Sequence, residues 1–414
     1  MDGTAKKQYD IVIAGGGMIG ASLALALAPL QLRVAVVEAV ARGEAQQPSF
    51  DDRSTALSRS TQRMFEAMGL WDDVIAASTP IRRIHVSDRG RFGFSHLDAA
   101  EQGVEALGYV VINRVLGEVL QTALGGLELV DVICPARVVD IDTTPDFASA
   151  TIEHEDGRKQ HLDCQLLVAA DGANSAVRPM MGICASKGEY GQHAVIGNLL
   201  PEKSLDYCAY ERFTDQGPLA LLPVADNRAG FVWTVASGDA DRVLGLNDDA
   251  FLAELQSAFG NRLGTFSRVG KRAAYPLSLS KAMRLTATRS VLVGNSAHGL
   301  HPVAAQGFNL GMRDVAALCD CIADARNEDA AAGTGSPELL RRYAEWRRSD
   351  QGKLVRLTDG IVRLFGSSRP PLRVARNIGM LGFDLIPGVR SLFARQMMGL
   401  AGRLPRLSRG VPLR

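Results

Sequence analysis

The chain is poor in the features that mark membrane-spanning, disulfide-linked and zinc-binding proteins. Its 414 residues contain no apolar run long enough to cross a bilayer, and the first nine residues are polar. We therefore expect no transmembrane helix and no secretory signal. The six cysteines form no C-x-x-C pair and no zinc-type spacing with histidine. This usage favours reduced thiols in a cytoplasmic protein that binds no metal.

Strong charge of one sign is also missing, since the net charge is only +1. No motif for DNA or RNA binding is present, so we expect no nucleic-acid partner. The chain has no internal repeat, and 46% of its residues are apolar. A chain of this length and composition can bury large cores, which predicts two intertwined domains and a tail.

A glycine-rich turn near the N-terminus predicts a dinucleotide site. The apolar run 9–14 leads into Gly15, Gly17 and Gly20 in the pattern G-x-G-x-x-G, followed by the alanine-rich run 21–27. In the order strand, turn, helix, such glycines allow a pyrophosphate to approach the backbone. A second apolar run, 34–37, ends in Glu38, at the spacing of a carboxylate that binds an adenosine ribose.

Two later segments have the same construction. The apolar strand pattern 166–170 ends in Asp171-Gly172, which could equally be an ordinary turn. The run 290–293 leads into a glycine-rich stretch, 294–314, with a helical pattern from about Leu310 onward. Small residues at a junction between a strand and a helix allow close approach of a ligand, and the helix start offers free N–H groups to an anion.

Taken together, the three segments resemble those of the FAD-dependent aromatic monooxygenases, and most closely those of the ubiquinone-biosynthesis hydroxylases. Within that family the chain is most similar to the 2-polyprenyl-6-methoxyphenol hydroxylases. The resemblance extends over nearly the whole chain and includes 50–57, Asn113-Arg114, 211–223 and 301–314. It implies an α/β fold in which a discontinuous Rossmann-like FAD-binding domain carries an inserted mixed or antiparallel sheet, followed by a helical C-terminal tail.

The resemblance also implies roles for individual residues. The first motif would hold the ADP part of FAD, Asp171-Gly172 would serve FAD and NAD(P)H, and the stretch from Gly294 would hold the ribityl chain and flank the flavin ring. Backbone N–H groups of residues 307–309 would stabilise negative charge on the reduced ring. The expected cofactor-binding residues are Gly15, Gly17, Met18, Ile19, Gly20, Glu38, Arg53, Arg114, Asp171, Gly172, Gly294, Asn295, Pro302, Gln306, Gly307, Phe308 and Asn309.

Two positions depart from the family pattern. Asn295 stands where most members have aspartate, so one acceptor survives and one negative charge is lost. The 6-methoxyphenol hydroxylases resemble this chain in having asparagine there. Ala304-Ala305 stands where glycine is usual, and the added methyl groups would narrow the site without excluding a flavin.

The implied reaction is hydroxylation of a prenylated methoxyphenol in ubiquinone biosynthesis. NAD(P)H would dock transiently and reduce FAD, and molecular oxygen would then give a C4a-hydroperoxide that hydroxylates the ring. Pro302 and Gln306 would lie beside the flavin ring and Pro218 on the substrate side. No acid or base can be assigned from the sequence; His298, His301 and Tyr210 are candidates, although structural histidines are commoner than catalytic ones.

The sequence pattern divides the chain into alternating segments. We expect the FAD-binding domain to comprise 1–79, 112–187 and 286–330, and the substrate domain 80–111 and 188–285. A helical basic region, 337–414, would follow a linker rich in alanine and glycine.

The tail admits two interpretations. From Lys353 to the end it has eleven arginines against two acidic residues, interleaved with apolar pairs. It could be an amphipathic element that contacts a membrane surface or a quinone-biosynthesis complex, which would suit a lipophilic substrate. It could equally pack its apolar side on the body of the protein.

Three other functions remain open at this point. The enzyme could hydroxylate another ring position or a soluble phenol. It could reduce prenyl chains on the same scaffold without activating oxygen. It could also be a non-catalytic flavin-binding member of an assembly. The sequence does not indicate ring position, prenyl length, NADPH or NADH preference, or oligomeric state.

Overall fold

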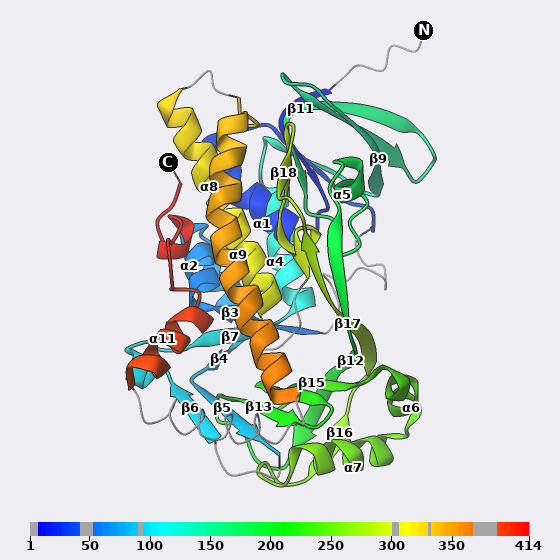
Figure 1. Cartoon of the computed structure of the whole chain (residues 1–414), viewed down its shortest axis with the longest axis vertical. Coiled ribbons are helices and arrows are strands. Elements are labelled where there is room, and N and C mark those ends of the chain that lie inside the picture. The colour runs from blue at the N-terminus through cyan, green and yellow to red at the C-terminus, as the bar shows by residue number, and fades with distance from the viewer. Residues whose placement is uncertain are drawn as a thin grey trace.

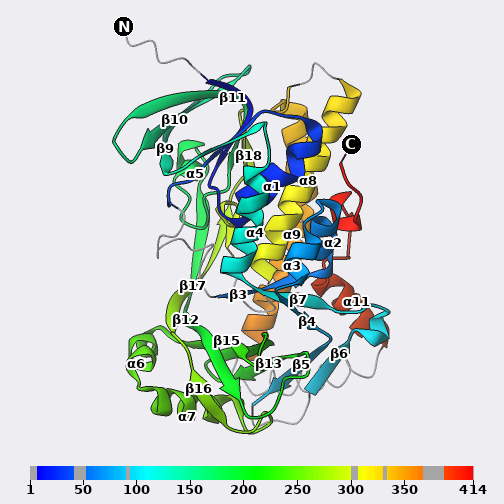
Figure 2. The same ribbon diagram turned by 180° about the vertical axis from the view of Figure 1, so that it is seen from behind.

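The computed structural model of the chain describes residues 7–41, 53–89, 94–299, 306–329, 333–366 and 387–413. Two large sheets lie toward opposite ends of an elongated molecule, and long helices run alongside one another between them (Figures 1 and 2). The expected fold class is confirmed, since the molecule is α/β with a Rossmann-like sheet and a separate, mostly antiparallel sheet.

The first sheet has eight strands and a parallel centre. Strands run in the order β18-β19-β11-β1-β2-β8, with β10 and β9 added beside β11. The central strands are continuous apolar runs because both faces are covered, and Ile11, Val12 and Ile13 are fully buried. The strands are β1 (Lys7–Ala14), β2 (Val34–Val37), β8 (Val130–Ile133), β9 (Ala136–Thr143), β10 (Ala148–His154), β11 (Lys159–Ala169), β18 (Thr286–Ala287) and β19 (Ser290–Leu292).

Helices of very different character cover this sheet. The first, α1, is apolar nearly all round and is enclosed between the sheet, α4 and α8. The long α9 lies against α8 and continues down to the second sheet, where it contacts β13 and β14 (Figure 1). The helices are α1 (Met18–Leu27), α2 (Arg59–Ala67), α3 (Trp71–Ile75), α4 (Asn113–Gly125), α5 (Val177–Met180), α8 (Gln306–Glu328) and α9 (Pro337–Gly366).

The second sheet has nine strands in the order β20-β17-β12-β15-β14-β13-β5-β6, with β16 paired to β12. Its outer face is covered by α6 (Ala240–Gly245) and α7 (Asp248–Phe259), which share a core with Phe231 and Trp233. The strands are β5 (Arg83–Asp88), β6 (Phe94–Asp98), β12 (Ala185–Pro201), β13 (Cys208–Thr214), β14 (Gly217–Pro223), β15 (Ala229–Ala236), β16 (Phe266–Val269), β17 (Ala273–Ala282) and β20 (His298–Gly299).

A small antiparallel sheet lies between the two large ones. It consists of β3 (Ser54–Ser58), β7 (Gly108–Ile112) and β4 (Ser78–Ile81). Its apolar residues meet the inner face of the nine-stranded sheet, where Val110 and Ile81 share a core with Ala209 and Val224. The inner face of the second sheet is therefore the one turned toward the first.

The strand pairings join segments that lie far apart in the sequence. Strands from 83–98 join strands from 185–282 in one sheet, although the chain between them passes through the other sheet. The segment 80–111 also supplies β7, which pairs with β3 in the small sheet instead. The strand β12 begins at Ala185, three residues before the proposed boundary.

Helix α8 differs in extent from the sequence pattern, since it begins at Gln306 and not near Leu310. Gly311 allows this helix to pack directly on α1. Within the helical region predicted for 337–414, helix α9 is continuous from Pro337 to Gly366. Part of the predicted linker, residues 330–332, lies outside the described residues.

The C-terminal tail packs on the body over much of its described length. Ala394 and Met398, at the end of α11 (Pro387–Met397), are buried with Leu97 of β6, and Leu407 and Leu413 join the main core. Two other α11 side chains, Val389 and Leu392, remain exposed. Within the described ranges, no helix combines the length and apolar character needed to cross a membrane.

Candidate functional site

The turn between β1 and α1 can be built only from glycine at two positions. Gly15 has φ of +102°, and a Cβ added to it would lie 2.5 Å from the carbonyl oxygen of Ala170. A Cβ on Gly20 would lie 1.9 Å from the oxygen of Gly15. The turn thereby holds the N-terminus of α1, with its free N–H groups, against the ends of β1 and β11.

Glu38 stands at the mouth of this turn, as the spacing predicts. It follows β2, and its carboxylate accepts hydrogen bonds from the backbone N–H of Gly16 at 2.7 Å and of Val40 at 2.9 Å. The amide of Gln121, on α4, donates to the carbonyl of Gly16 at 3.1 Å. A carboxylate held by backbone donors beside a glycine turn is placed to accept from the hydroxyls of a ribose.

Ile19 joins the first motif to the third. A Cβ on Gly311, in α8, would lie 2.8 Å from the Ile19 side chain, and one on Gly294 would lie 3.2 Å from it. Gly294 also has φ of +64°. The glycines of the third motif therefore make room for α1, which brings segments from opposite ends of the chain to one place.

The Asp171-Gly172 segment joins the same site through Arg178. The buried Arg178 guanidinium donates to the carbonyl of Ser296 at 2.9 Å, within the third motif. One oxygen of Asp171 accepts from the N–H of Val177 at 3.1 Å, while its other oxygen is buried without a hydrogen-bond partner. Such an unsatisfied acceptor needs a donor, which a bound ligand or water would supply.

A fully buried carboxylate, Asp314, ties the third motif to α9. One oxygen accepts from the N–H of Gly294 at 3.0 Å and from His298 Nε2 at 2.7 Å. The other accepts from Arg347 Nε at 2.6 Å and from Gln351 Nε2 at 3.0 Å. Burial alone would raise the pKa of Asp314, but the Arg347 guanidinium and the His298 and Gln351 hydrogen bonds hold it well below its usual range.

The side chains at the start of α8 bond to other protein segments. Asn309 accepts from the N–H of Ser58 and from the Thr61 hydroxyl, both at 2.8 Å, and donates to the carbonyl of Ala56 at 2.8 Å. Gln306 donates to the carbonyl of Met397 at 3.3 Å. These bonds fix the first turn of α8. The backbone N–H groups of a first helical turn have no acceptor within the helix, so they are available to a ligand.

Other predicted site residues lie in different surroundings. Asn295 is exposed, so its amide is accessible to a ligand. The Arg53 guanidinium lies over the ring of Tyr275, 4.8 Å from its centroid. Arg114 is exposed on α4 and pairs with Glu118 at 3.2 Å. Pro218 is buried on β14.

The chain matches the model of the FAD-binding domain family over residues 8–358. It is 39% identical to the ubiquinone hydroxylase UbiL of Rhodospirillum rubrum, over 99% of this chain and 95% of that protein. It is 32% identical to the 3-demethoxyubiquinol 3-hydroxylase of Escherichia coli, over 94% and 98% of the two chains. The chain belongs to the FAD-dependent ubiquinone hydroxylases.

Solved structures show the same fold. The p-nitrophenol 4-monooxygenase PnpA from Pseudomonas putida superposes with a TM-score of 0.79, covering 96% of this chain and 99% of that one, at 20% identity. The match to the family model and the full-length relatives confirm the family resemblance that the sequence indicates, and they confirm an FAD-dependent monooxygenase as the class of enzyme.

The described residues fit an FAD. No side chain fits at Gly15 or Gly20, so a phosphate can reach the backbone of this turn. Glu38 and the Asp171 oxygen without a hydrogen-bond partner supply acceptors for the ligand's hydroxyl groups. Pro302 and His301 lie outside the described residues, as do Ala304 and Ala305.

Two of the three candidate bases have other roles. His298 is buried and bonded to Asp314, the structural arrangement that is commoner for histidine. Tyr210 points to the outer face of its sheet and meets Phe259 of α7 edge-on at 5.7 Å, because alternation along β13 turns it away from the FAD-binding sheet. Burial raises the pKa of Tyr210 to about 12, which also disfavours it as a base.

Three residues that sequence analysis did not select prove important to the site. Arg178, Asp314 and Arg347 are all buried charges whose partners lie far away in sequence. Asp314 ends the glycine-rich stretch 294–314 and Arg178 follows Asp171-Gly172 closely, but nothing in the sequence reveals which partner each one finds. Buried charges are rarely left unpaired, so only the fold could identify them.

We expect Gly15→Val to yield a folded but colourless protein. The side chain would collide with the Ala170 carbonyl and adopt a φ that valine rarely reaches, so the turn must move out of reach of the pyrophosphate. Flavin absorbance of the purified protein measures the loss. Gly125→Ala, where an added Cβ meets nothing within 4 Å, is the control and should keep its flavin. A normal flavin spectrum in Gly15→Val would refute the placement.

We expect Asp314→Asn to lower the free energy of unfolding by about 3–5 kcal/mol, because Arg347 would be left as a buried charge without its carboxylate. The Asp314 pKa is depressed in the fold, so its contribution is present above the unfolded pKa of about 3.9 and is lost as the pH falls below it. Denaturant unfolding at neutral and acidic pH measures both effects.

The control for this experiment is Asp324→Asn, on the same helix. Asp324 makes only partly exposed ion pairs with Arg406 and Arg342, so its loss should cost no more than about 1 kcal/mol. Equal costs for the two variants would contradict the special position of Asp314.

Proposed function

We propose that this enzyme hydroxylates the ring of a polyprenyl methoxyphenol during ubiquinone biosynthesis, with NAD(P)H as reductant and molecular oxygen as co-substrate. The observation that carries the proposal is the convergence of the three motifs around Ile19, Arg178 and Asp314. Full-length relatives that carry the names of ubiquinone hydroxylases support it.

Each motif has a part in holding FAD. The turn at Gly15 receives the pyrophosphate, Glu38 the adenosine ribose, and Gly294 with the exposed Asn295 the ribityl chain. The N–H groups of residues 307–309, at the start of α8, would stabilise the negative charge that reduction places on the flavin ring. When bound, FAD takes up hydride from NAD(P)H and activates oxygen, and the protein supplies position and exclusion of water.

The substrate ring lies between the flavin and the inner face of the nine-stranded sheet. Central strands place apolar side chains on that face, among them Ile196, Ala220, Leu222 and Val232, and each is partly exposed. A prenylated ring needs such an apolar wall. Pro218, on the same face, belongs to the substrate side, as the family resemblance implies.

The substrate is delivered at a membrane surface through α11. Val389 and Leu392 are 45% and 66% exposed, and the exposed basic residue Arg395 lies on the same helix, whereas Arg390 pairs with Glu101. Basic and apolar side chains on one short helix suit an anionic lipid surface, where a polyprenyl lipid resides.

We expect Leu392→Glu to weaken co-sedimentation with vesicles that contain anionic lipid, because it removes an exposed apolar contact and adds repulsion. Met283→Glu is the matched control: Met283 is 69% exposed and follows β17, outside the tail. Equal binding by both variants and the unchanged protein would exclude this role for α11.

The proposed reaction is tested in cells of the source organism, grown in air with and without this protein. Mass spectrometry of lipid extracts should show a prenylated methoxyphenol that lacks one ring hydroxyl accumulating when the protein is absent. An unchanged quinone profile would contradict the proposal and favour a soluble phenol as substrate.

A further inference from the structure

A carboxylate, Glu211, lies on the inner face of the substrate sheet. On β13 it is flanked by Tyr210 and Arg212, which point to the opposite face. In the register of the sheet Glu211 pairs with Val86 of β5 and Ala220 of β14, so its neighbours on either side are apolar. Alternation therefore turns this one acidic side chain toward the FAD-binding part of the molecule.

The side chain of Glu211 makes no hydrogen bond or ion pair with any residue that the structure describes. It is nevertheless only partly exposed, on an interior strand of the sheet. Carboxylates in such surroundings normally have a partner, because an isolated buried charge is costly. Burial raises the pKa of Glu211 to about 7, and no charged neighbour contributes to this shift.

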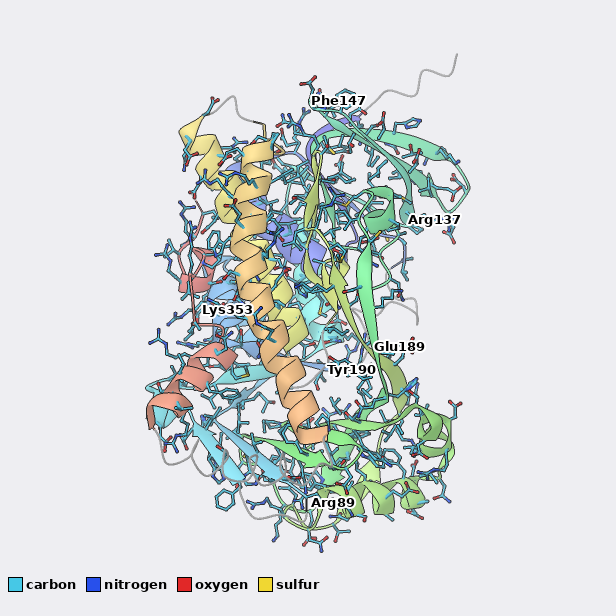
Figure 3. All side chains as sticks on the ribbon, in the orientation of Figure 1. Arg89, Arg137, Phe147, Glu189, Tyr190 and Lys353 are labelled. Carbon is cyan, nitrogen blue, oxygen red and sulfur yellow. The ribbon has the colours of Figure 1, made fainter. Side chains whose placement is uncertain are left out.

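Charged side chains lie on several of the elements next to Glu211. Asp88 lies on the same face of β5, two positions along, opposite Phe213. Arg212 and His85 lie toward the outer face, beside α7. On α9, which packs against β13 and β14, Lys353 and Arg356 are exposed, and Lys353 projects from the surface of the helix in Figure 3.

We propose that Glu211 binds the ring hydroxyl of the substrate and takes up its proton, an inference that rests on the proposed function. A phenol ionises near pH 10 in water, whereas a carboxylate with a pKa near neutrality is matched to accept its proton in a water-poor site. The unpartnered oxygens, the apolar wall and the direction toward the flavin motifs are what such a base requires.

In the proposed hydroxylation, Glu211 takes a proton from the substrate and returns it by the end of the reaction. The phenolic O–H bond breaks as the proton moves to a Glu211 oxygen, and the negative charge on the ring favours attack of the ring carbon on the transferred hydroxyl. The ring carbon then carries both hydrogen and the new C–O bond. The transferred hydroxyl would come from O₂ reduced with two electrons from NAD(P)H through FAD, so the O–O bond breaks as the C–O bond forms. The hydrogen on the ring carbon is lost as a proton, which restores aromaticity; the second oxygen atom takes up this proton and leaves as water. Glu211 returns its own proton to the original ring oxygen.

Turnover of the FAD-loaded enzyme tests this role, with a methoxyphenol that bears a short prenyl tail as the probe. We expect kcat of the wild type to rise with pH through a limb near pH 7. Glu211→Gln should lower kcat by roughly 10²-fold or more and remove that limb, with KM and FAD content little changed. Glu211→Asp should keep the limb at a reduced rate.

The control is Glu254→Gln, on the outer helix α7, where the carboxylate pairs with Arg242. This variant should retain the rate and pH profile of the wild type. Wild-type kcat and an intact limb in Glu211→Gln would overturn the inference. Absence of product from the wild type itself would instead count against the proposed function.

Thermal melting provides a readout that does not depend on turnover. When folding raises the pKa of a carboxyl group, the folded protein loses stability as the pH rises. For Glu211 this loss begins near the unfolded pKa of 4.5 and continues through the folded pKa of about 7. Glu211→Gln should therefore melt higher than the wild type at about pH 8, and the difference should vanish below about pH 4.5. A difference that does not change with pH, or no difference, would show that Glu211 is not a buried titrating group.

Discussion

The carboxylate of Asp314 is the constraint on which the site depends. It is fully buried, and four donors from the third motif and α9 converge on it. Since an uncompensated charge at this depth is costly, the fold is stable only when β19, α8 and α9 are all in place. Asp314 thereby fixes the turn at Gly294, which lies against Ile19 and α1. The residues that hold this turn are distant in sequence from the N-terminal glycine motif that it contacts.

The second constraint is that successive side chains along each strand of the nine-stranded sheet point to opposite faces. It sends Tyr210, Arg212 and the aromatic residues of the outer core toward α7. The opposite face holds mostly apolar side chains together with Asp88 and Glu211. In the proposed function the substrate lies between the flavin motifs and this face. A catalytic group can then come from the sheet, although the motifs proposed to hold the cofactor belong to the other half of the molecule.

The sequence predicts what is local and fails where partners are distant. The glycine turn, the position of Glu38 and the strand at 34–37 follow from patterns within some thirty residues, and the structure has them. His298 and Tyr210 were candidates for the base because imidazole and phenol can titrate, and only the fold shows one bonded to Asp314 and the other turned outward. Glu211 stands in a motif that sequence analysis quoted, but without the strand register its direction is unknown.

The central claim is that this chain transfers an atom of molecular oxygen to the ring of a prenylated phenol. The most direct measurement is turnover of the purified FAD-loaded enzyme under ¹⁸O₂, with mass spectrometry of the product. The account expects one ¹⁸O atom in a new ring hydroxyl, formed in step with NAD(P)H oxidation. A product without the label, or a saturated prenyl chain in place of a hydroxylated ring, would contradict it.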